Sequence, residues 1–141
     1  SAPAVAQVPL ILEWKTNMKF GTFASDGAGG GTVVIPPTSN TRTLTGLLTD
    51  FGGTVKRGKF KLTGEPKTWV VLTMPSTIVI QKGTTAHNMT ISNLTLSTTN
   101  PVKLSAKGLK NVFFGGTLTV GTDQKKGTYK NESFIVNAEY Q

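Results

Sequence analysis

Residues 134–140 read Phe-Ile-Val-Asn-Ala-Glu-Tyr, so apolar side chains recur at every second position. Successive side chains of a β-strand point to opposite faces of a sheet. A strand here would have one wholly apolar face and one mostly polar face. The apolar face would consist of Phe134, Val136, Ala138 and Tyr140. We expect a half-buried strand that begins near Tyr129 and runs to Tyr140.

The same period of two extends through most of the chain, and Gly, Pro, Asn and Asp interrupt it every few residues. Signals for helices are almost absent. Further strands are expected at residues 32–35, 43–48, 59–63, 68–74, 77–80, 88–96, 102–106 and 112–120. Many short strands at such spacing are typical of a β-sandwich. The sequence therefore predicts an all-β fold.

The N-terminal region carries the longest alternation. Its apolar positions are Ala4, Ala6, Val8, Leu10, Leu12 and Trp14, followed by Met18 and Phe20. Pro9 divides this run, so it is either one long strand or a short extension hinged to a first strand over 10–20. Aromatic residues in alternating strands usually point inward, so we expect both Trp14 and Trp69 in the core or at its edge.

Composition excludes several kinds of chemistry. The chain has 141 residues, 15.0 kDa, no cysteine and one histidine. The missing cysteines exclude disulfides, thiol catalysis and cysteine zinc sites. The seven carboxylates are isolated, with no sign of a catalytic pair. We therefore expect no enzymatic activity, no cofactor and no metal site.

The formal charge is +8, although only 16% of residues are charged. The densest basic group is Lys56, Arg57, Lys59 and Lys61. It is either a solvated face or a patch for an acidic partner such as an acidic polysaccharide. No apolar run approaches the roughly 18 residues of a membrane span. The small residues at the start resemble the region around a signal-peptidase cut, which suggests export.

The C-terminal segment resembles that of chaperone-usher pilus subunits. The shared features are a glycine about fourteen residues from the end (Gly127), the alternating apolar strand and the penultimate Tyr140. The whole chain is also similar to the spore-coat-U-like secreted bacterial proteins. The stretches that carry this second resemblance are 18–22, 30–35, 41–46, 60–64, 89–94, 115–120 and 127–129.

This resemblance implies an immunoglobulin-like sandwich that lacks its last strand. The groove so left would be filled first by a periplasmic chaperone and then by the N-terminal extension of another subunit. Residues 1–9 would be the extension and 10–141 the single domain. Gly127, Phe134, Val136, Ala138 and Tyr140 would line the groove and contact the chaperone. The inserted donor side chains would be Ala4, Ala6, Val8 and Leu10.

The expected function is thus a structural subunit of an exported surface fibre, serving adhesion or biofilm formation. Its partners would be other copies of itself, together with a chaperone and an usher, in the periplasm and on the surface of a Gram-negative bacterium. The alternative is a secreted, adhesin-like module that completes its own sheet with residues 8–14. Such a module would bind acidic polysaccharide or another surface ligand.

Overall fold

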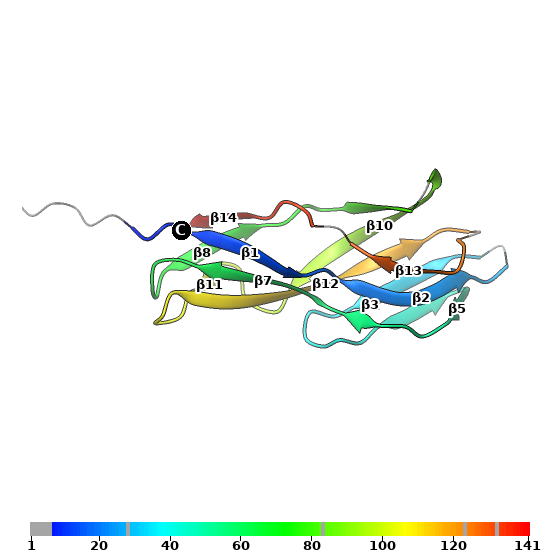
Figure 1. Cartoon of the computed structure of the whole chain (residues 1–141), viewed down its shortest axis with the longest axis horizontal. Coiled ribbons are helices and arrows are strands. Elements are labelled where there is room, and N and C mark those ends of the chain that lie inside the picture. The colour runs from blue at the N-terminus through cyan, green and yellow to red at the C-terminus, as the bar shows by residue number, and fades with distance from the viewer. Residues whose placement is uncertain (1–6, 28, 83, 123, 132) are drawn as a thin grey trace, which may run out of the picture.

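The computed structural model describes residues 7–27, 29–82, 84–122, 124–131 and 133–141, without the side chains of 81–88. Every regular element in these ranges is a β-strand, and every strand pair is antiparallel (Figure 1). The predicted all-β sandwich is confirmed. The described residues contain no helix with the length and apolarity that crossing a membrane requires.

The largest sheet contains seven of the described strands. Its main path is β1 (Ile11–Thr16), β7 (Gly58–Thr63), β12 (Leu109–Val120), β10 (Thr84–Leu96) and β9 (Ile78–Lys82). The long β12 pairs with β7 through its first half and with β3 (Gly31–Ile35) through its second half. Outside β3 lies β4 (Thr43–Gly46). The strand β12 therefore organises the whole sheet.

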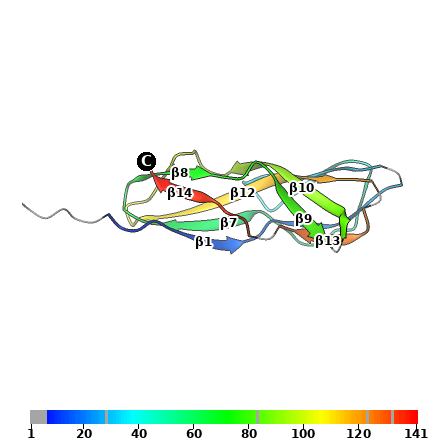
Figure 2. The same ribbon diagram turned by 90° about the horizontal axis from the view of Figure 1, so that it is seen from above.

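Two smaller sheets complete the fold. One has the order β11 (Val102–Lys103), β8 (Trp69–Thr73) and β14 (Asn137–Tyr140). The other has the order β13 (Gly127–Lys130), β2 (Lys19–Ser25) and β5 (Leu48–Asp50), with β6 (Val55–Lys56) also on β2. In Figure 2 the strands β8 and β14 form the layer opposite β1 and β7. The two layers bury their facing side chains between them.

The core follows directly from the alternation. In β7 the buried positions are Gly58, Phe60 and Leu62, and the positions between them face outward. Phe60 and Phe114 are fully buried with ring centroids 6.0 Å apart. Large aromatic and aliphatic side chains fill this layer, which supplies the main stabilisation of a chain without disulfides.

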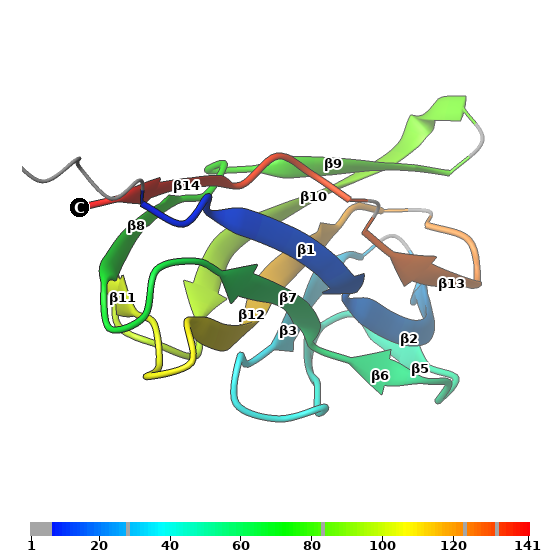
Figure 3. The same ribbon diagram turned by 60° about the vertical axis from the view of Figure 1, so that its left-hand side comes forward.

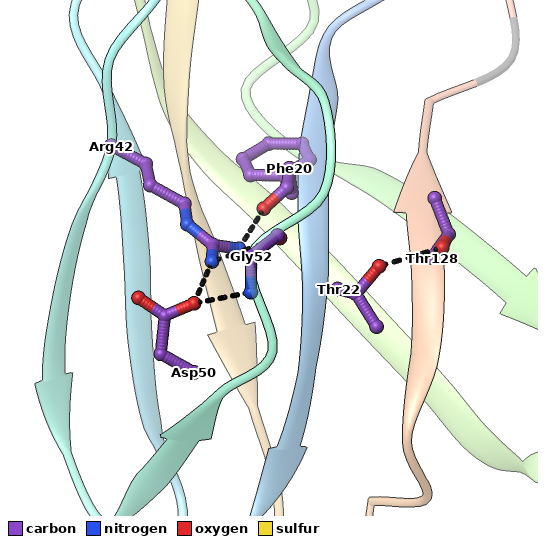
Figure 4. A network of polar contacts seen from close by, with 6 residues as sticks. All are labelled: Phe20, Thr22, Arg42, Asp50, Gly52 and Thr128. Atoms are coloured by element: carbon purple, nitrogen blue, oxygen red, sulfur yellow. Dashed lines mark hydrogen bonds and ion pairs between the residues drawn. The ribbon is translucent and has the colours of Figure 1, made fainter.

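Arg42 fastens the second small sheet (Figure 4). Its guanidinium is largely buried and donates hydrogen bonds to the Phe20 carbonyl at 2.6 Å, the Gly52 carbonyl at 3.1 Å and the Asp50 carboxylate. Gly21 lies beside it with a φ of 78°, and a Cβ there would overlap the guanidinium. Only glycine meets both requirements at this position. The stretches 18–22 and 41–46 therefore meet in one structural cluster.

Three boundaries differ from the sequence expectations. The first strand is two strands, β1 and β2, because the chain changes partner from β7 to β13 after Asn17. The single strand expected over 129–140 is likewise divided into β13 and β14, which pair with β2 and β8. The strand β10 begins at Thr84, whereas the sequence predicted a strand that starts only at residue 88.

Candidate functional site

Two strands at the ends of the chain each leave one edge without a partner. β1 pairs with β7 on one side, and β14 pairs with β8 on one side. Within the described ranges, no strand pairs with the other edge of either. An unpaired edge presents a row of backbone N–H and C=O groups that can bind another strand.

These two edges belong to opposite layers and face one another (Figure 3). We call β1 together with residues 134–140 the seam. The Trp14 ring of β1 meets the Phe134 ring edge-on, with centroids 4.8 Å apart. Phe114 from the core contacts both rings, at 5.2 Å and 5.6 Å. The two sides of the seam are thus within reach of each other through side chains, without a backbone ladder between them.

The seam is lined by half-buried apolar side chains that pack against the core. They are Leu12, Trp14, Phe134, Val136, Ala138 and Tyr140. The residues between them are exposed, and among these the apolar Ile135 is 86% exposed. Incomplete burial of six inward-facing apolar side chains leaves apolar surface that a further strand could cover.

One end of the seam is held by the Tyr140 hydroxyl. This hydroxyl donates to the Val8 carbonyl and accepts a hydrogen bond from the Glu65 N–H at 2.8 Å. The Val8 N–H in turn donates to the Glu65 carboxylate at 2.9 Å. Val8 is therefore tied to both layers immediately before β1 begins.

Asn131 closes the other end. Its side chain is fully buried and accepts a hydrogen bond from the Met18 N–H at 2.6 Å. The backbone N–H of Asn131 donates to the Met18 carbonyl at 3.2 Å. Beyond this point β2 and β13 pair directly, and the Thr22 and Thr128 hydroxyls lie 2.9 Å apart (Figure 4). The seam therefore extends from Tyr140 to Asn131.

The structure brings four of the five residues expected in the acceptor groove into the seam: Phe134, Val136, Ala138 and Tyr140. Gly127 lies outside the seam, in the ladder between β13 and β2, where it pairs with Phe23.

Two of the four residues expected as donors, Ala4 and Ala6, lie outside the described residues. Val8 is 42% exposed, and Leu10 packs against the core of its own domain. Leu10 thus takes part in the packing of its own domain.

Sequence reasoning missed Asn131 and Glu65, and the prediction for Trp69 was wrong. Asn131 was not singled out in the sequence, whereas the structure shows that it joins two strands through Met18. A signal was present, because the apolar positions change from odd numbers at Tyr129 to even numbers from Phe134 onward. Trp69 is 46% exposed on the outer face of β8, and Val70 points inward instead.

The four basic residues expected to form a patch lie on β6, β7 and the residue between them. Lys59 and Lys61 point outward from the largest sheet. Nearby, Lys15 lies 2.8 Å from Glu13 and, with Lys61, holds the pKa of the Glu13 carboxyl below its usual value. No three side chains of His, Asp or Glu gather as a metal site in the part of the chain that the structure describes.

Comparison with known proteins gives one family. Residues 12–140 match the family model of a domain of unknown function (DUF4402). No curated protein and no solved structure matches the chain.

Proposed function

The chain belongs to the DUF4402 family, and from its geometry we propose that the protein is a structural subunit of an exported fibre. The observation that carries the proposal is the seam, where two unpaired strand edges face each other over half-buried apolar side chains. A strand from a second copy would bind between these edges. Its backbone would complete two ladders, and its alternate side chains would cover the apolar lining.

The proposed donor is the segment between Pro3 and Pro9 of another copy. Residues 4–8 read Ala-Val-Ala-Gln-Val, and all five have a backbone N–H. The two prolines therefore flank this run of backbone N–H groups and do not interrupt it. Five residues span about 17 Å as a strand. A buried Val8 would contribute about 1.5–3 kcal/mol, and the alanines less.

Insertion between copies fits the direction of the chain at Val8 better than insertion within one chain. Val8 is bound to Tyr140 and Glu65, and the chain continues from there along β1 away from this end of the seam. On either route Val8 would exchange these two hydrogen bonds for the ladder of the seam that it enters. Only insertion into its own seam would require the segment before Pro9 to reverse direction.

The resemblance to chaperone-usher pilus subunits extends the proposal to the setting. The subunit would be exported to the periplasm of a Gram-negative bacterium, where a chaperone would occupy the seam before an usher delivers the subunit to a surface fibre. The fibre would serve adhesion or biofilm formation. We assign the subunit no catalytic role and no cofactor.

Four chains test this proposal when each is refolded from denaturant and its mass is measured by light scattering. They are the full chain, a deletion of residues 1–9, Val136→Arg in the seam and Ile135→Arg on the exposed face. The full chain and Ile135→Arg should assemble. The deletion lacks a donor and Val136→Arg lacks an acceptor, so each should remain monomeric. Refolded together, these last two should form a one-to-one dimer.

The complementation separates assembly from simple loss of folding, because an unfolded variant could not form the dimer. Assembly of the deletion variant, or of Val136→Arg, would overturn the proposal. A full chain that stays monomeric at all concentrations would favour the self-contained binding module instead.

A further inference from the structure

The outer face of the largest sheet carries a row of lysines that the seam does not use. Lys15 of β1 and Lys59 and Lys61 of β7 line a shallow hollow of about 570 Å³, together with Asn111 of β12. The pairing explains the arrangement, because Lys61 lies between Glu13 and Asn111, and Lys59 lies beside Thr16. Lys59 and Lys61 are two residues apart, so they share a face at a spacing of about 7 Å.

A second hollow of about 240 Å³ continues the row. Lys59 borders both hollows, and Lys56 and Arg57 line the second one with Asn40 and Phe113. Arg57 is fixed there, because its guanidinium carbon lies 3.5 Å from the centroid of the Phe113 ring and its Nη1 donates a hydrogen bond to the Pro37 carbonyl at 3.0 Å. The row thus contains one anchored cation, Arg57, and four lysines.

The row remains strongly positive after its neighbouring carboxylate is included. Glu13 pairs with Lys15 at 2.8 Å, and both side chains are well exposed. This one carboxylate is opposed by five cations, so positive charge is concentrated on the face. Such a face attracts a polyanion and releases counterions when the polyanion binds.

We propose that this face binds a linear acidic polysaccharide and that its lysines contact the carboxylates of the polymer. The row is shallow and open, which suits a flexible, hydrated polymer. Lysine ammonium groups act as mobile point charges and suit carboxylates spaced along such a chain. Nucleic acid is less well matched, because single strands bind through bases stacked on aromatic rings and Arg57 already covers Phe113. The site is independent of the seam, since Lys15 and the seam residue Trp14 point to opposite faces of β1.

Alginate, a linear polymer of uronic acids, is the probe for the full chain, with neutral dextran as the control polymer and a poly-dT strand as the competing polyanion. Binding is measured by biolayer interferometry from low to physiological salt. Alginate should bind with an affinity that falls steeply with salt, and dextran should not bind. The double variant Lys59→Gln, Lys61→Gln should bind alginate about tenfold more weakly.

The control Lys103→Gln, Lys107→Gln removes the same charge from exposed lysines on another part of the surface and should bind like the unmodified chain. Glu13→Gln should bind a few-fold more tightly, a gain that misfolding would not produce. Equal losses in both lysine pairs would mean that net charge alone matters and would overturn the proposal. Absence of alginate binding at low salt, or tighter binding of poly-dT, would also overturn it.

Discussion

Single polar side chains set the limits of the seam. Asn131 is fully buried and joins β13 to the junction of β1 and β2 through Met18. Tyr140 joins the last strand to Val8 and Glu65 at the other end. Buried or partly buried polar groups such as these are stable only with their partners in place. They therefore mark the points at which the two layers are held together.

Asn131→Ala should lower the free energy of unfolding by about 1–3 kcal/mol, because the Met18 N–H would be left buried without its acceptor. Urea unfolding followed by fluorescence measures the change. Asn137→Ala is the matched control, since Asn137 is exposed on β14 and its loss should cost within about 0.5 kcal/mol. Equal effects at the two positions would show that Asn131 does not hold the strands.

At the scale of elements, the alternation in β7 and β12 decides the packing of the core. Gly58 stands at an inward position of β7, directly against the ring of Phe114. Its lack of a side chain is what allows that ring to lie beside Phe60 and behind Trp14. The aromatic layer beneath the seam therefore depends on a glycine in a strand.

Gly58→Ala should destabilise the fold by about 1–3 kcal/mol, because the new Cβ would overlap the Phe114 ring and force it to move. Gly121→Ala is the control, since a Cβ there meets nothing within 4 Å and φ is not in the left-handed region. Thermal or urea unfolding of the two variants gives the comparison. A Gly58→Ala protein as stable as Gly121→Ala would contradict the packing described.

Periodicity predicted the strands well but not their partners. Leu12, Trp14, Met18 and Phe20 all occupy even positions, so nothing in the pattern marks the change of sheet after Asn17. The exchange of partners depends on contacts between residues more than a hundred positions apart, such as Met18 with Asn131.

The sequence pattern also could not predict that Trp69 points outward, for a different reason. Residues 69–72 are all apolar, so both faces of β8 are chemically acceptable as the inner one. The structure buries Val70 and Leu72. By contrast, the C-terminal alternation has one wholly apolar face, and the four residues of that face lie where the pattern placed them.

At the scale of the whole molecule, the two ends of the chain meet along one side, and the basic face lies on the outer surface beside it. β1 contributes to both, with Trp14 toward the seam and Lys15 toward the lysine row. A subunit could thus be joined to its neighbour through the seam while the basic face stays accessible. We infer that a second chain binds at the seam.

Amide hydrogen exchange, read residue by residue in the monomeric deletion of residues 1–9 and in assembled full chain, tests this claim most directly. Amides of β1 and β14 should become protected on assembly, because their unpaired edges would gain a ladder. Amides of β9, an edge strand away from the seam, should exchange equally in both samples. Protection that appears at β9 and not at β1 and β14 would contradict the account.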